Sequence, residues 1–70
     1  MKWHDINKSQ PKVGQNVIAV GTWEGEVYGR GDDGYMGIGT WTGNHVDIDA
    51  DTYYVWITDV THWQPLPGWP

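Results

Sequence analysis

Apolar and polar residues alternate along most of the chain with the two-residue period of β-strands. The clearest strand is predicted at residues 16–23, because residues 17–20 form a continuous apolar run, which is typical of a central strand covered on both faces. Residues 35–41 and 53–58 alternate in the manner of half-buried strands. No window of helical period reaches the length of a stable helix, so the chain is predicted to be all-β.

Turn residues separate these segments. A connection at residues 24–25 predicts a tight hairpin into a strand at 26–30, and Asp32-Asp33-Gly34 predicts the next turn. Residues 45–52 predict a polar loop with a short strand at 46–48. Thr58-Asp59 is predicted to end the strand at 53–58 before a last short strand at 60–63. We expect one domain, residues 1–70, formed by a small curled antiparallel sheet or partly open barrel of about four to five strands.

The end of the chain has the most specific pattern, Thr61-His62-Trp63-Gln64-Pro65-Leu66-Pro67. Proline cannot donate to a sheet ladder, so the last strand is predicted to stop near Trp63, followed by an extended proline-rich tail over one edge of the sheet. With Trp3, Pro11, Gly14 and the apolar run at 17–20, this ending resembles a bacterial and phage family known as domain of unknown function 551.

The resemblance implies a phage or prophage origin and a small β fold, and it brings no assigned activity. Residues 23–54 depart from the family pattern in length and are richer in glycine and tryptophan. We interpret the matching residues as a structural latch in which His62 is a hydrogen-bonding core residue that holds the tail. Its members are Trp3, Thr61, His62, Trp63, Pro65 and Pro67.

The composition adds one feature to this prediction, a high number of tryptophan and tyrosine residues. The chain has six tryptophans and four tyrosines but no phenylalanine and no cysteine, so disulfides and thiolate metal sites are excluded. Tryptophan and tyrosine suit half-buried positions, interfaces and ligand cradles. Core packing is the commoner explanation for any single ring. A small sheet has only one core face, however, so the remaining aromatic side chains would be exposed. We therefore expect a homo-oligomer that covers this aromatic surface.

The charge excludes some partners. Four Lys and Arg oppose nine Asp and Glu, for a net charge of −5, which argues against binding extended nucleic acid or an anionic membrane. The N-terminal segment has no apolar stretch typical of a signal peptide, and no run approaches transmembrane length. We therefore expect a cytoplasmic protein, in the cytosol of the host cell.

Metal and catalytic patterns are weak. Asp47-x-Asp49-x-Asp51 has the spacing of the opening of a calcium loop, but the turn glycine and closing glutamate are missing, so a solvated hairpin loop is favoured. His4, His45 and His62 have no short metal spacing. The single serine, Ser9, has no base nearby in sequence, and turn placement explains Asp32-Asp33. We predict no metal, no cofactor and no enzymatic activity.

Binding is the remaining candidate. Aromatic residues on consecutive predicted strands interleave with glycines that let a ligand approach the backbone, and Gly37 and Gly39 predict a trough between two of the rings. The sole arginine could clamp a phosphate or carboxylate, or form a surface salt bridge to Glu24, Glu26 or Asp32. The predicted ligand-binding residues are Trp23, Tyr28, Arg30, Tyr35 and Trp41.

These observations lead to one main functional hypothesis and one alternative. The main hypothesis is a non-catalytic binding protein of phage or prophage origin, acting as a counter-defence factor. It would either sequester a small nucleotide-type signal in an aromatic pocket or inhibit a host protein. The alternative is a structural or assembly module that acts only by protein–protein packing.

Overall fold

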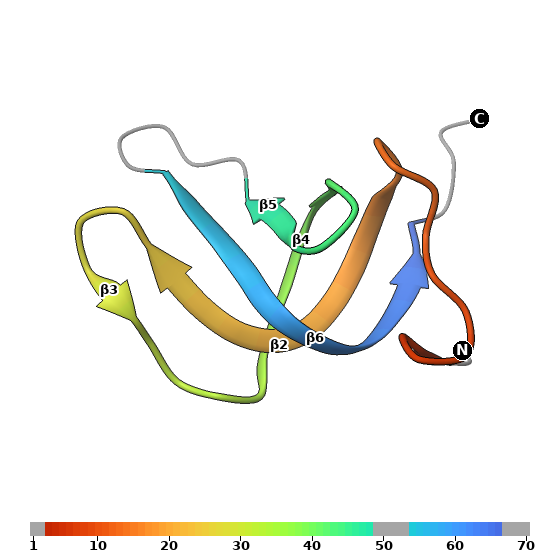
Figure 1. Cartoon of the computed structure of the whole chain (residues 1–70), viewed down its shortest axis with the longest axis horizontal. Helices are drawn as coiled ribbons and strands as arrows, with labels where there is room; N and C mark the ends of the chain where they lie inside the picture. Colours follow the sequence, from red (N-terminus) through yellow and green to blue (C-terminus); the bar gives the residue numbers. More distant parts are fainter. Residues whose placement is uncertain (1–2, 49–53, 67–70) are drawn as a thin grey trace.

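The structure, a computed structural model, describes residues 3–48 and 54–66, and strands are its only regular elements there. All strands belong to one antiparallel sheet, so the predicted all-β antiparallel class is confirmed (Figure 1). The strands are β1 (His4–Asp5), β2 (Asn16–Gly25), β3 (Gly29–Arg30), β4 (Tyr35–Trp41), β5 (Val46–Ile48) and β6 (Val55–Pro65).

The sheet curls into a partial ring. Its strand order is β1-β6-β5-β4-β2-β3, and β6 pairs in addition with β2. Figure 1 shows β2 and β6 as long, bent ribbons, and these two strands share more of the sheet than any other pair. The short strands β1 and β3 extend the sheet beyond the ring, so the described residues form six strands instead of the four to five predicted.

The predicted break at Asp59 is a bulge inside one continuous strand. Residues 53–58 and 60–63 were expected to form separate strands, but β6 runs through Asp59 and ends at Pro65. Asp59 has a φ of 49°, and the β2–β6 register shifts between Val20 and Thr22. A Cβ on Gly21 would lie 2.6 Å from the carbonyl oxygen of Thr58, so glycine is required where β6 bends across β2.

The first hairpin turns later than the sequence predicts. Glu24 and Gly25 were expected to form the turn, but both belong to β2, where they pair with β6 as well as with β3. This double pairing keeps the strand extended through Gly25. The turn comprises residues 26–28, and Gly29 follows with a φ of 74°.

The core lies inside the partial ring. It contains Val17, Ala19, Trp41, Val46, Ile57, Val60 and Trp63. The trough predicted at Gly37 and Gly39 faces this core and is filled: a Cβ on Gly37 would lie 3.1 Å from Cδ1 of Ile57, and one on Gly39 would meet the backbone of Asp47. These glycines therefore let β4 pack closely against β5 and β6 and do not form a ligand trough.

The family-like ending closes the fold through Trp63. Its indole Nε1 donates to the carbonyl of Ser9 at 2.7 Å, and its ring packs on His4 with centroids 4.6 Å apart. The backbone N–H of Ile6 donates to the carbonyl of Thr61 at 3.0 Å. The latch therefore joins the N-terminal segment to β6.

Among the other latch residues, His62 differs from the prediction. His62 was expected to be a core residue, but it is exposed, because the alternation of β6 turns it away from buried Trp63. The hydroxyl of Thr61 donates to the carbonyl of Val20 at 3.3 Å. Pro65 is exposed at the end of β6, and Leu66 N–H donates to the carbonyl of Asn16 at 3.3 Å, whereas Pro67 lies outside the described residues.

Candidate functional site

Three of the predicted ligand-binding rings lie at one end of the sheet. The rings of Trp23 and Tyr28 have centroids 5.9 Å apart. Trp23 and Tyr35, together with Gly31 and Asp32, line an open hollow of about 360 Å³, which we call the aromatic hollow. Trp41 does not join them, because it is 3% exposed and belongs to the core.

The backbone of residues 31–32 shapes one wall of the aromatic hollow. Gly31 N–H donates to the carbonyl of Trp23 at 2.6 Å, and Trp23 N–H donates to the carbonyl of Asp32 at 3.3 Å. A Cβ on Gly31 would lie 2.6 Å from Cε3 of Trp23. Glycine is thus needed for this segment to lie against the indole.

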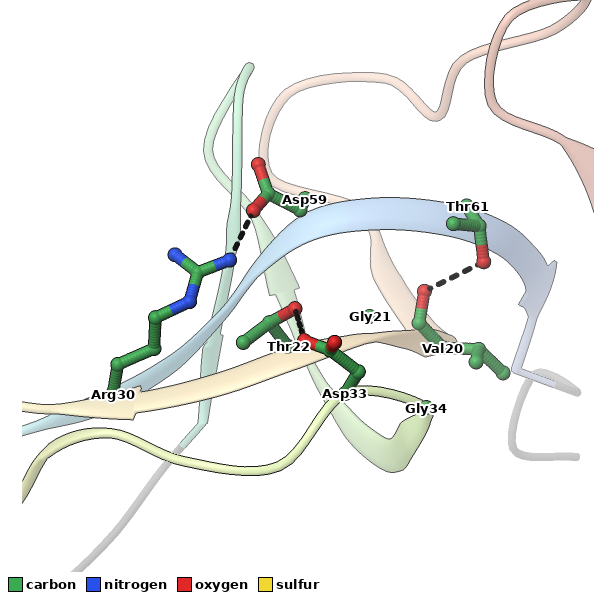
Figure 2. Close-up of a pocket in the computed structure, with 8 residues that line it drawn as sticks. All are labelled: Val20, Gly21, Thr22, Arg30, Asp33, Gly34, Asp59 and Thr61. Atoms are coloured by element: carbon green, nitrogen blue, oxygen red, sulfur yellow. Dashed lines mark hydrogen bonds and ion pairs between the residues drawn. The ribbon is translucent and has the colours of Figure 1, made fainter.

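Arg30 forms a surface ion pair. Its guanidinium Nη2 donates to Oδ2 of Asp59 at 2.7 Å (Figure 2). Its Nη1 lies 3.9 Å from Oε2 of Glu24. The hydrogen bond that Arg30 donates to Asp59 raises the pKa of Arg30 above its ordinary value. Of the two alternatives left open by the sequence, the structure shows the salt bridge, with Asp59 as the nearer partner.

The hollow around Arg30 is acidic. It measures about 420 Å³, and its charged lining residues are Arg30, Asp33 and Asp59 (Figure 2). Oδ1 of Asp33 accepts a hydrogen bond from the hydroxyl of Thr22 at 2.9 Å. A phosphate here would meet one arginine already paired with a carboxylate and a second carboxylate nearby, so the electrostatics oppose an anion.

A site that the sequence analysis missed lies on the other side of β2. Val17 and Ala19 point into the core, so Ile18 and Val20 point to the opposite face of the sheet. There Ile18 lies across from Ile38 on β4 and Gln64 on β6, and Val20 lies across from Met36 and His62. We call this surface, with Trp3 beside it, the outer face; it comprises Trp3, Ile18, Val20, Met36, Ile38, His62 and Gln64.

The outer face is apolar, exposed and hollowed. Met36 is 60% exposed, Ile38 56% and Trp3 38%. A hollow of about 490 Å³ is lined by Trp3, Ile18, Met36, Gly37, Ile38 and Gln64. A smaller one of about 270 Å³ continues past Trp3 to Val20 and His62. The apolar run at 17–20 predicted a strand covered on both faces, and the described residues cover fully only the core face.

Acidic residues border the outer face. Asp5 pairs in register with His62, and Val20 also lines the hollow that contains Asp33 and Asp59. The nearby Arg30 is ion-paired, as described above. The apolar surface therefore has a negative border on the sides next to His62 and Val20.

A polar cluster occupies the β5–β6 hairpin. Oδ1 of Asp47 accepts a hydrogen bond from the hydroxyl of Tyr54 at 2.6 Å and lies 2.9 Å from Nε2 of His45. The hydrogen bond to Asp47 raises the pKa of Tyr54. The rings of Tyr54 and Trp56 pack with centroids 5.1 Å apart. Asp47 is thus engaged by side chains of its own hairpin.

The three histidines weighed as metal ligands form no metal centre within residues 3–48 and 54–66. No group of three or more His, Cys, Asp or Glu side chains in these ranges could hold a metal ion. Asp49 and Asp51 of the calcium-like spacing lie outside the described residues. A search of the same ranges finds no helix with the length and apolar character needed to span a membrane.

The fold and this surface define a small all-β protein with an exposed apolar sheet face. The profile of DUF551, a family of proteins of unknown function, matches residues 2–70. The chain therefore belongs to the DUF551 family, which is the family that its sequence resembles. Comparison with curated proteins and with solved structures finds no match.

Proposed function

We propose that this protein is a non-catalytic binding protein of phage or prophage origin that binds and inhibits a host protein through its outer face. One observation carries the proposal: the apolar pairs Ile18–Ile38 and Val20–Met36 lie side by side on an exposed face. Monomeric soluble proteins seldom expose large contiguous apolar surfaces, and methionine and tryptophan are enriched in the centres of interfaces.

The chemistry of the border selects the kind of partner. Asp5, Asp33 and Asp59 lie next to the apolar centre, and the chain as a whole has a net charge of −5. The complementary surface has apolar side chains that enter the hollow beside Trp3, surrounded by lysine and arginine. Such charge complementarity accelerates association and excludes acidic competitors.

The same charges make nucleotide sequestration the weaker of the two routes expected from the sequence. The predicted clamp, Arg30, is paired with Asp59, and the aromatic hollow has Asp32 in its lining. A phosphate group would have to displace one carboxylate and approach others. A protein partner at the outer face needs no such displacement.

The test compares charged substitutions on and off the outer face. Met36→Glu and Ile38→Glu place a carboxylate in the apolar centre, whereas Val13→Glu makes the same kind of change at a residue that is 74% exposed and does not belong to this surface. Proteins captured by the parent chain are purified, and their affinity for each variant is measured by calorimetry. We expect Met36→Glu and Ile38→Glu to weaken binding at least tenfold, and Val13→Glu to leave it unchanged.

Two outcomes would contradict the proposal. Equal affinity of all three variants would show that the partner binds elsewhere. If the outer face mediates only self-association, seen as a dimer by light scattering that Ile38→Glu dissolves, the alternative of a packing or assembly module replaces it.

A further inference from the structure

The aromatic hollow is lined by two aromatic residues and one acidic residue. Trp23 and Tyr35 line it, Tyr35 is 40% exposed, and the ring of Tyr28 lies beside that of Trp23. Among the residues that the structure describes, Asp32 is the one charged residue in its lining. Indole and phenol rings have electron-rich faces that attract cations, and a nearby carboxylate adds to that attraction.

Neighbouring charged groups reinforce the preference of the aromatic hollow for cations. Asp33 follows Asp32 in the chain, and Glu24 follows Trp23. The nearby cation Arg30 lines the separate hollow with Asp33 and is paired with Asp59. The field at the aromatic hollow is therefore negative, although the rings taken alone would suit a nucleotide base as well as a cation.

We propose that the aromatic hollow binds an organic cation, the alkylammonium of lysine or a free amine, or the guanidinium of arginine. The cation sits between the rings of Trp23 and Tyr35 with its charge toward Asp32. Because the hollow is open and about 360 Å³ in volume, an isolated amino acid binds weakly, with a dissociation constant in the millimolar range.

The inference does not depend on the proposed function. Tyr35 and Met36 are adjacent on β4, so their side chains leave opposite faces of the sheet. Variants at Tyr35 or Asp32 thus change the aromatic hollow, and variants at Met36 or Ile38 change the outer face. Failure of one proposal leaves the other intact.

The experiment is an NMR titration that follows the indole N–H signal of Trp23, assigned by its loss in Trp23→Phe. The probes are Nα-acetyl-lysine amide, Nα-acetyl-arginine amide, tetramethylammonium chloride and adenosine monophosphate. We expect at least one cation to shift the Trp23 signal with saturation, and adenosine monophosphate to leave it in place. Preference for the amino-acid amides would indicate a protein side chain as the source, and preference for tetramethylammonium a free quaternary amine.

Matched variants distinguish cation binding at the aromatic hollow from a general attraction of cations to the negatively charged protein. Asp32→Asn is expected to weaken cation binding about fivefold. Glu26→Gln removes the same charge in the nearby turn, outside the lining, and should leave the affinity within twofold. Tyr35→Phe keeps the ring and should bind, whereas Tyr35→Leu should lose binding severalfold. Equal losses for Asp32→Asn and Glu26→Gln, no shift with any cation, or saturable binding of adenosine monophosphate alone would overturn the proposal.

Discussion

Ile38 lies directly across from Ile18 in the β2–β4 ladder, and 56% of Ile38 remains exposed. On the other side of the same sheet, Ile57 is completely buried. The protein thus has apolar side chains on both faces of its central strands, one face enclosed by the partial ring and the other open. We interpret the open face as the binding surface.

The two faces should differ sharply in their contribution to stability. Ile57→Ala leaves a cavity in the core and should lower the free energy of unfolding by about 2–5 kcal/mol. Ile38→Ala removes the same atoms from an exposed site and should change it by less than about 1 kcal/mol. Urea unfolding of both variants measures the difference, and equal losses would show that the outer face is part of the folding core.

The bulge should make Gly21 indispensable. A Cβ at this position would lie 2.6 Å from the Thr58 carbonyl and 2.7 Å from Cγ2 of Ile57, so Gly21→Ala should cost roughly 2–3 kcal/mol. The matched control is Gly25→Ala in the same strand, where the nearest atoms are side-chain atoms at 3.2 Å. Gly25→Ala should cost less than about 1 kcal/mol. Similar thermal stability of the two variants would contradict the described crossing of β6 over Gly21.

The latch should depend on Trp63 and be insensitive to His62. Trp63→Ala empties a buried site and should cost about 3–5 kcal/mol, whereas Trp63→Phe loses the hydrogen bond to Ser9 and should cost roughly 1–2 kcal/mol. Exposed His62→Ala should stay within about 0.5 kcal/mol of the parent. A His62→Ala variant that unfolds as easily as Trp63→Ala would restore the core role that the sequence predicted for this histidine.

Tyr54 should give the protein an alkaline loss of stability. Its hydrogen bond to Asp47 raises its pKa, so the folded state holds the phenolic proton more tightly than the unfolded chain does. The resulting stabilisation is complete below the ordinary tyrosine pKa of about 10 and is lost as the pH rises through the higher pKa of the folded state. The melting temperature of the parent should therefore fall more steeply above about pH 10 than that of Tyr54→Phe. Parallel curves would show that this hydrogen bond does not form in solution.

Local patterns predicted the strands well and their connections less well. The bounds of β4 and β5 agree with the prediction because their alternation is flanked by glycine or polar turns. The turn expected at Glu24 and Gly25 lies at residues 26–28 instead, because pairing with β6 holds Glu24 and Gly25 in β2. The break expected at Asp59 became a bulge because Gly21 lets β6 cross close to β2. Both corrections depend on residues distant in the sequence.

The candidate site was predictable in part. The sequence grouped Trp23, Tyr28, Tyr35 and Trp41 on consecutive strands. The structure brings the first three together at one end of the sheet, whereas ring closure places Trp41 in the core. The outer face was missed although its signal was present: the apolar run at 17–20 indicated two covered faces, and residues 36 and 38 indicated where the second lies. Alternation shows that two residues share a face, but only the register shows which strand lies beside them.

The most direct test of the outer face is site-specific photocross-linking in bacterial cells that express the protein. A benzophenone side chain replaces Ile38 in one variant and Val13 in another, both at exposed positions. We predict that position 38 forms an adduct with one other protein, that position 13 does not, and that adding Met36→Glu abolishes the adduct. Equal adducts from both positions, or an adduct at 38 that persists with Met36→Glu, would contradict the assignment of the outer face as the binding surface.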